Sequence, residues 1–168
     1  MERRFISLDD WHLAMSSIKD LRERIIFYTI YYTGCSETEI LSLRFSDVDH
    51  EKNLIRFSDR ESSIPEKLSL DIKEFKGSSK SEYLLSSRQS DQMSPKRLQQ
   101  IVTESSRKNF GSKISPQDIR YIHICHALLK NVPPVSIAKQ VGVSYQRIAQ
   151  VLEEIDDYLE TRCFVYEL

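Results

Sequence analysis

The stretch from residue 117 to residue 152 constrains the fold of this chain more than any other part. It reads QDIRYIHICHALLKNVPPVSIAKQVGVSYQRIAQVL, which predicts a long apolar-periodic helix, a Pro-Pro break, a short helix, a turn that contains a glycine, and another helix. Helix-turn-helix spacing is shown by Ile137, Ala138, Gly142 and Ile148. In such a unit a small residue lets two helices cross closely, a glycine relaxes the turn, and an apolar side chain fills the space between the helices. We therefore expect a helix-turn-helix-like unit over residues 133–152.

The second short helix of this unit is expected to present a polar face to the outside. Val141, Val143 and Val151 complete its apolar inner side. The side chains that remain for the outer face are Ser144, Tyr145, Gln146, Arg147 and Gln150. In DNA-binding helix-turn-helix proteins this face contacts base edges and phosphates, so the pattern favours a DNA-binding protein. The alternative is an ordinary helical hairpin whose Val and Ile side chains only fill a core.

Charge is distributed unevenly along the chain. The net charge of −1 argues against a general binder of polyanions. Residues 95–152, however, contain nine Lys or Arg and two Asp or Glu, whereas residues 1–94 contain 14 and 17, and residues 153–168 contain one and six. The candidate phosphate contacts in the positive segment are Lys96, Arg97 and Lys139. The acidic end is an objection, because it would repel DNA if it lay beside the second helix.

Composition is typical of a globular cytoplasmic protein. With 168 residues, 40% of them hydrophobic, the chain is long enough for one domain with a single core. No apolar run has membrane-spanning length, and no signal-peptide core follows the first residues. The cysteines lie far apart in the sequence, at Cys35, Cys125 and Cys163, which favours buried thiols over disulfides. We expect no cofactor and no metal: His123 and His126 have a metal-compatible spacing, but no set of ligands completes it, so packing is favoured.

The first part of the chain predicts three helices. Ser7 is a suitable cap for the first of them. A second, continuously apolar helix ends at Gly34 and is expected to be the central buried one, with its tyrosines in the core. Ser36 and Glu39 have the spacing of a capping box that opens the third.

After residue 48 the apolar residues follow the period of strands rather than helices. Residues 53–57 read as a strand and residues 62–65 as a poorer one. The helix signal returns at Ser94-Pro95, where a capping residue precedes a proline at the first helical position. These patterns predict a mainly helical α+β domain with one small antiparallel sheet.

Three motifs follow one another as they do in tyrosine recombinases. YYTGCSETEILSLRFSDVD resembles the family's TGLRxSELLxLRWxDID, QMSPKRLQQIV resembles its LSPxxxxxxx helix, and SPQDIRYIHICHALLKNVPPVSIAKQVGV resembles PHDLRHTFATHLLENGVxxxxIQxLLGH. The similarity covers roughly residues 8–152. The chain thus resembles the catalytic domain of the tyrosine recombinase and phage integrase family, which implies that domain's fold and double-stranded DNA as its partner.

The resemblance also implies catalytic positions, and this chain departs from the family at most of them. The family uses a Tyr nucleophile, two Arg that neutralise the scissile phosphate, and a Lys and a His that assist proton transfer. The second Arg is kept as Arg120. The other positions carry Ser36 for the first Arg, Gln117 and Val143 for His residues, and Leu152 for the Tyr. The hairpin turn that would hold the Lys reads Asp59-Arg60-Glu61, in which Arg60 is a weak substitute.

These departures predict that the chain is not an enzyme, because losing one such group costs on the order of 10²–10⁴ in rate. We expect a non-catalytic DNA-binding protein derived from a tyrosine recombinase. Such a pseudoenzyme would act in the cytoplasm, on the nucleoid, as a transcriptional regulator or an accessory DNA-binding factor. Two alternatives stay open: a protein-interaction module on the same scaffold, and an active recombinase with Tyr145 or Tyr158 as a displaced nucleophile.

We divide the chain into a DNA-binding domain of residues 1–152 and an acidic C-terminal tail of residues 153–168. In recombinases the C-terminal segment often docks on a neighbouring subunit. By that resemblance, we expect the tail to pack on its own domain or on a second copy, which would give a homodimer. Arg120 is expected either to be a retained phosphate ligand or to form a surface salt bridge with Asp118.

Overall fold

The computed structural model describes residues 6–166, with side chains described as far as residue 157. Its elements in chain order are the helices α1 (Leu8–Ser17), α2 (Leu21–Thr33) and α3 (Glu37–Ser42), the 3-10 helix η1 (Phe45–Asp47), the strands β1 (Val48–Asp49), β2 (Leu54–Arg56) and β3 (Glu61–Ser63), and the helices α4 (Glu66–Ser78), α5 (Pro95–Phe110), α6 (Pro116–Leu129), α7 (Pro134–Val141) and α8 (Tyr145–Tyr166). The predicted class, mainly helical with one small antiparallel sheet, is confirmed. Within the described range, none of the helices combines the length and apolar character that crossing a bilayer requires.

The first and third helices begin, and the second ends, where the sequence predicts. The Ser7 hydroxyl accepts a hydrogen bond from the Asp10 N–H at 3.2 Å. Ser36 and Glu39 form the predicted reciprocal capping box at the start of α3. Gly34 ends α2 in the left-handed conformation, with φ at 64°.

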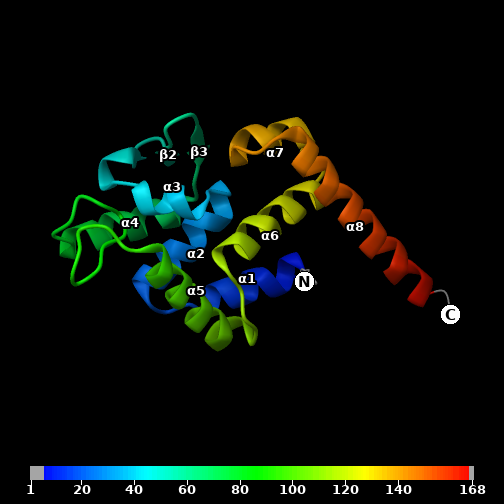
Figure 1. Ribbon diagram of the computed structural model, residues 1–168, viewed down its shortest axis with the longest axis horizontal. Helices are drawn as coiled ribbons and strands as arrows, with labels where there is room; N and C mark the ends of the chain where they lie inside the picture. The colour runs from blue at the N-terminus through cyan, green and yellow to red at the C-terminus, as the bar shows by residue number, and fades with distance from the viewer. Residues whose placement is uncertain (1–5, 167–168) are drawn as a thin grey trace.

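Helix α2 lies at the centre of the main core. Its Ile25, Ile26, Phe27 and Ile30 are completely buried. Trp11 of α1 packs beside it, with its ring centroid 5.1 Å from that of Tyr31. Figure 1 shows α1, α4, α5 and α6 around this helix, and each of them contacts it. The expectation of a central buried helix with its tyrosines in the core is confirmed, although Tyr32 is only partly buried.

The strands form an antiparallel sheet in the order β1-β2-β3, in which Ile55 pairs with both Val48 and Ser62. The predicted strand over residues 53–57 is confirmed as β2, while the poorer one lies one to two residues earlier than expected. Helix α4, which follows, was not predicted. It buries Leu68 and Ile72, and its Asp71 receives two hydrogen bonds from Arg24 of α2, at 2.7 and 2.8 Å.

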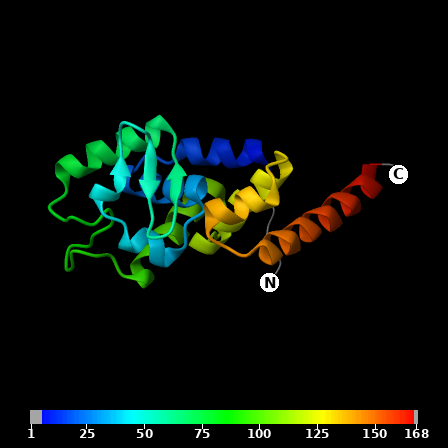
Figure 2. The same cartoon turned by 90° about the horizontal axis from the view of Figure 1, so that it is seen from above.

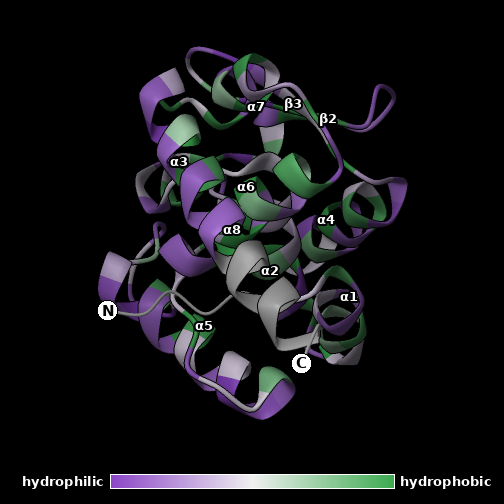
Figure 3. Ribbon diagram, turned by 90° about the vertical axis from the view of Figure 1, so that its right-hand side faces the viewer, coloured by the Kyte–Doolittle hydropathy of each residue, from purple (hydrophilic) through white to green (hydrophobic). Residues whose placement is uncertain are grey.

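Helices α6, α7 and α8 enclose a second, smaller core. It consists of Ile124, Cys125, Leu128, Ile137, Val141, Ile148, Val151 and Ile155. Past this core α8 runs on in one direction, away from the rest of the molecule (Figures 1 and 2), and so continues through the predicted boundary between residues 152 and 153. Figure 3, which faces this end of the molecule, shows hydrophilic residues on the described turns of α8.

Candidate nucleic-acid interface

Helices α7 and α8 are joined by a short turn at residues 142–144. Gly142 closes α7 with φ at 70°, and its N–H donates to the Ala138 carbonyl at 3.0 Å. The Ser144 hydroxyl accepts a hydrogen bond from the Arg147 N–H at 3.3 Å, so this serine caps the start of α8. Ile137 and Ile148 are completely buried between the helices, as predicted.

The expected outer face is largely free of other elements. Ser144, Gln146 and Gln150 are exposed, and the Tyr145 side chain is 53% exposed. Lys139 is exposed on the neighbouring α7. The exception is Arg147, which is half-buried. Its Nη1 lies 3.2 Å from Gln150 Oε1 and 3.9 Å from Glu154 Oε1.

The acidic residues of α8 begin at Glu153, three residues after Gln150, and continue along the same helix. Glu154 accepts a hydrogen bond from the Tyr121 hydroxyl at 2.7 Å, which ties α8 to α6. Glu153, Asp156 and Asp157 are exposed on the part of the helix that leads away from α7 (Figure 2). The described part of the acidic end therefore does not cover the start of α8, but it begins beside it, with Glu154 3.9 Å from Arg147.

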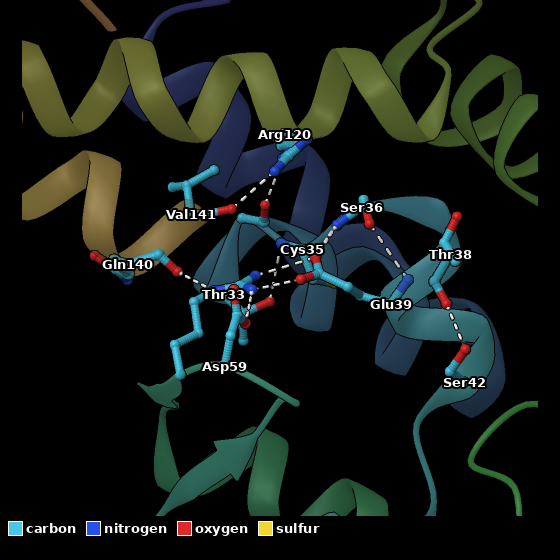
Figure 4. A network of polar contacts seen from close by, with 12 residues as sticks. Thr33, Cys35, Ser36, Thr38, Glu39, Ser42, Asp59, Arg120, Gln140 and Val141 are labelled. Carbon is cyan, nitrogen blue, oxygen red and sulfur yellow. Dashed lines mark hydrogen bonds and ion pairs between the residues drawn. The ribbon is translucent and has the colours of Figure 1, made fainter. Parts of the chain in front are cut away.

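Arg120 does not form the predicted alternative salt bridge with Asp118. Its Nε donates to the Gly34 carbonyl at 2.7 Å and its Nη2 to the Val141 carbonyl at 2.8 Å, which joins the ends of α2 and α7 (Figure 4). Asp118 instead completes a capping box with Ser115 at the start of α6. Burial, together with the charge of nearby Arg60, lowers the pKa of Arg120, while the charge of Glu39 opposes this shift. An arginine keeps its positive charge under such conditions.

A cavity of about 760 Å³ lies between α6 and the first turns of α8. Arg120 and Arg147 both line it, together with Gln117, Val143 and Lys113. Two arginines that are 27 residues apart in the sequence therefore face one space, which the Asp118 carboxylate also lines.

Lys96 and Arg97 lie elsewhere, on the exposed first turn of α5. That end of α5 is joined to α3, since Gln99 Nε2 lies 3.2 and 3.3 Å from the Glu37 carboxylate oxygens. Figure 1 shows α5 and α7 apart, with α2 and α6 between them. The two lysine and arginine clusters that the sequence grouped together are thus on separate parts of the molecule.

No family model matches the chain, but a curated protein is similar to it. The relative is the tyrosine recombinase XerA of Pyrococcus furiosus, which is 27% identical over 146 residues, covering 80% of this chain and 51% of the relative. Among solved structures, XerA recombinase superimposes with a TM-score of 0.78 at 20% identity, covering 95% of this chain and 63% of that one. The XerH site-specific recombinase bound to its difH substrate, in a post-cleavage complex, gives a TM-score of 0.78 at 14% identity over 99% of this chain and 54% of XerH.

The chain has the fold of a tyrosine-recombinase catalytic domain. The transposon Tn1549 integrase, solved with a circular intermediate DNA, shares it with a TM-score of 0.75 at 11% identity, over 90% of this chain and 62% of that one. The resemblance to tyrosine recombinases is thus supported by sequence and by structure. The chain spans about half the length of the curated relative that it matches.

These comparisons correct the expectation that the chain is not an enzyme. Its relative and its structural neighbours are tyrosine recombinases, which are enzymes, and nothing in the structure shows this chain to be inactive. The physical reason for the error is that the prediction treated each missing group of the tyrosine-recombinase set as lost chemistry. Sequence alone does not show which other groups the fold brings to the same place.

The structure places the positions that correspond to the tyrosine-recombinase catalytic set as follows. Gln117, Arg120 and Val143 face the cavity beside α8, while Ser36 is occupied in capping α3. Leu152 is 36% exposed on α8. The Tyr158 side chain lies outside the described residues.

Arg60 is the residue of this region whose role the sequence did not reveal. It was considered only as a weak replacement for the hairpin lysine of recombinases. In the structure both of its terminal nitrogens donate to the Glu39 carboxylate, and its Nε donates to the Gln140 carbonyl at 2.6 Å. Burial raises the pKa of Glu39, but the hydrogen bonds and charge of Arg60, together with the hydrogen bonds from Ser36, hold that pKa below its usual range. The only sequence signal was an arginine in a turn, with no indication of its partner 21 residues away.

Proposed function

We propose that this chain binds double-stranded DNA through the exposed face of α7 and α8. Lys139, Ser144, Tyr145, Gln146 and Gln150 form the contact surface, and Arg147 and Arg120 supply positive charge in the adjoining cavity. The observation that carries the proposal is this open polar face beside two arginines, on a fold whose neighbours XerH and the Tn1549 integrase were solved with DNA. Lys96 and Arg97 are a second, separate phosphate contact on α5.

In this proposal the chain acts on specific sites, either as a transcriptional regulator or as an accessory DNA-binding factor. The two roles share one requirement, which is preference for a particular sequence over random duplex. Selection of bound sequences from a pool of random duplexes tests that requirement and identifies the site.

DNA binding itself is tested by fluorescence anisotropy with a duplex at several salt concentrations. We expect the affinity to fall steeply with salt, because phosphate contacts release counterions. Lys139→Ala is expected to lower the affinity by roughly 3- to 10-fold. It is also expected to reduce the salt slope, which is the slope of log K against log salt concentration, by about one. Lys73→Ala, an exposed lysine on α4, is the matched control and is expected to bind like the wild type. Absence of binding at about 50 mM salt contradicts the proposal and favours a protein-interaction module.

A second candidate function is DNA strand transfer, which the XerA relative favours. Tyr145 is exposed at the first residue of α8 and is the described tyrosine available as a nucleophile on this face. A nicked duplex that traps covalent protein–DNA adducts tests it. Loss of an adduct in Tyr145→Phe or Tyr158→Phe identifies the nucleophile. No adduct with the wild type, in a sample that binds DNA, rejects this second function.

We further propose that residues 153–168 mediate a homodimer, as the C-terminal segments of recombinases often contact a neighbouring subunit. The protruding course of α8 supports this, because its last described turns have no element of the same chain beside them in Figure 1. Light scattering of the full chain and of a chain ending at residue 152 tests the proposal. A monomer mass for both rejects it.

A further inference from the structure

The Arg60 side chain lies where three separate parts of the fold meet. It follows β2 in the turn of the hairpin, yet only 8% of its side chain is exposed. Its two terminal nitrogens donate to Glu39 of α3, the second of them at 3.0 Å, and its Nε donates to the carbonyl of Gln140 in α7. Figure 4 shows the partners from these elements, Glu39 and Gln140, directed toward the same point.

The guanidinium also lies close to two further residues. Its central carbon lies 4.5 Å from the centroid of the Phe57 ring. A Cβ atom added to Gly142 would approach Arg60 Nη1 to 2.9 Å. Gly142 is therefore favoured by its φ of +70°, and a side chain there would also displace the guanidinium. A flat, forked cation fills this site, and a lysine ammonium does not reproduce it.

The anion that receives Arg60 is itself fixed. Glu39 accepts a hydrogen bond from the Ser36 N–H at 2.7 Å as part of the capping box of α3. Arg60 also contacts Asp59 at 3.1 Å, which brings its hydrogen bonds to four: one to Gln140, two to Glu39 and one to Asp59. A guanidinium has five N–H donors, so one at most is left for a DNA phosphate.

We infer that Arg60 is a positioning residue for the proposed DNA-binding face. It anchors the end of α7 and the turn at residues 142–144 to the hairpin and to α3, and it does not itself bind DNA. The inference rests on the proposed function, since the face that Arg60 holds in place is the one assigned to DNA. Without this anchor the turn keeps its apolar contacts but loses the polar contacts that fix it on the hairpin side.

Hydrogen exchange measured by mass spectrometry on the DNA-free protein tests the positioning role. Arg60→Met keeps an apolar stem against Phe57 and removes the fork. Glu39→Gln keeps the capping oxygen and removes the charge. In both variants we expect amides of residues 138–147 to exchange about 10-fold faster or more, while amides of α2 keep their protection and show that the fold is intact.

Arg56→Met is the matched control. Arg56 belongs to the same sheet and also pairs with two carboxylates, those of Asp49 and Glu61, but it is 45% exposed and these contacts stay within the sheet. It is expected to leave exchange at residues 138–147 unchanged. Exchange in Arg60→Met within about twofold of the wild type overturns the inference.

A DNA-binding measurement on the same variant distinguishes a positioning role of Arg60 from direct contact with DNA. In Arg60→Met we expect an affinity loss of roughly 10-fold with an unchanged dependence of log K on log salt, because no phosphate contact is removed. A salt slope smaller by about one overturns the inference and makes Arg60 a phosphate ligand. Should the wild type bind no DNA, the proposed function fails, while the exchange experiment still decides whether Arg60 positions the turn.

Discussion

At the scale of single residues, buried polar groups on α6 connect it to the rest of the chain. His126 Nδ1 lies 3.0 Å from the Tyr31 hydroxyl and its Nε2 lies 2.8 Å from the Ile6 carbonyl. The carbonyl can only accept, so Nε2 carries the hydrogen and Nδ1 accepts from Tyr31. His123, one turn earlier, has a buried Nε2 without a hydrogen-bond partner among the described residues. Both histidine rings also pack edge-on against the ring of Tyr31.

The first prediction concerns the pH dependence of stability through His123. Burial lowers its pKa to about 4 from 6.5, helped by the nearby His126 and opposed by a hydrogen bond to the Tyr31 backbone. Because the unfolded chain takes up the proton first, this contribution to stability is complete above pH 6.5 and is lost as the pH falls from there toward 4. Between pH 7.5 and 5.0 the loss amounts to about 2 kcal/mol.

Urea unfolding at those two pH values measures this change in the free energy of unfolding. His123→Asn, which keeps a donor near the position of Nδ1, is expected to reduce the pH dependence by about 2 kcal/mol. Leu13→Ala, at a 72% exposed position that does not titrate, is the control and is expected to keep the pH dependence of the wild type. Equal pH dependence in the wild type and His123→Asn would show that the folded protein does not lower the pKa of this residue.

At the scale of elements, the ends of helices decide how the pieces meet. The end of α2 at Gly34 touches the end of α7, since a Cβ on Gly34 would lie 2.7 Å from Val141 Cγ2 and 3.1 Å from His123 Cδ2. Arg120 joins the same two ends through its hydrogen bonds to Gly34 and Val141. The glycine of the Thr-Gly pair in the sequence motif is therefore required by the packing of α2 against α7.

The second prediction compares two glycines. Gly34→Ala is expected to destabilise the fold by roughly 2 kcal/mol or more, because φ is +64° and Val141 leaves no space. Gly77→Ala, within α4 and with no atom within 4 Å of its added Cβ, is expected to stabilise the fold by about 0.5–1 kcal/mol. Urea unfolding at about pH 7.5, where His123 is uncharged in the folded and the unfolded chain, measures the free energy of unfolding of each variant. It shows whether the two substitutions change it in opposite directions. A neutral Gly34→Ala would refute the close contact between α2 and α7.

At the scale of the whole molecule, the chain forms two cores of different size. The larger surrounds α2, and the smaller is enclosed by α6, α7 and α8. Helix α6 contributes to both, with Ile119 and Ile122 in the larger and Ile124 and Leu128 in the smaller. The proposed DNA-binding face is built on the smaller core, which buries less apolar surface and is expected to open more easily.

The third prediction follows from this division. Ile148→Ala removes a completely buried side chain from the smaller core and is expected to lower the free energy of opening of α7 and the start of α8 by about 2–4 kcal/mol. Native-state hydrogen exchange is expected to show reduced protection of the amides of α7 and the start of α8. The amides of α2, which exchange through global unfolding, are expected to change little. Leu13→Ala, at a 72% exposed position on α1, serves as the control and is expected to change neither. Equal loss of protection in α2 and α7 would mean that the two cores unfold as one.

Features that depend on neighbours a few residues away could be predicted from the amino-acid sequence. Ser7, Ser36 and Gly142 specify helix ends because their partners lie within four residues, and the spacing of Ile137, Val141 and Ile148 specifies which side of the helical pair is buried. The three motifs in order were enough to predict the recombinase fold. Helix α4 was missed, although Leu68 and Ile72 have helical spacing, because its mostly polar sequence offers no capping side chain and begins after Pro65.

Contacts between groups that are distant in the sequence could not be predicted and are seen in the folded chain. Arg60 pairs with Glu39 and Gln140, and Arg120 bonds to backbone carbonyls rather than to Asp118, because the folding of α2, α3 and α7 against the hairpin brings those acceptors within 3 Å. The direction of α8 was likewise beyond the sequence, since an amphipathic pattern fixes which side of a helix is buried but not where the helix leads. Local patterns encode short-range contacts; the strength of a charged contact depends on separation and burial, and these exist only once the chain has folded.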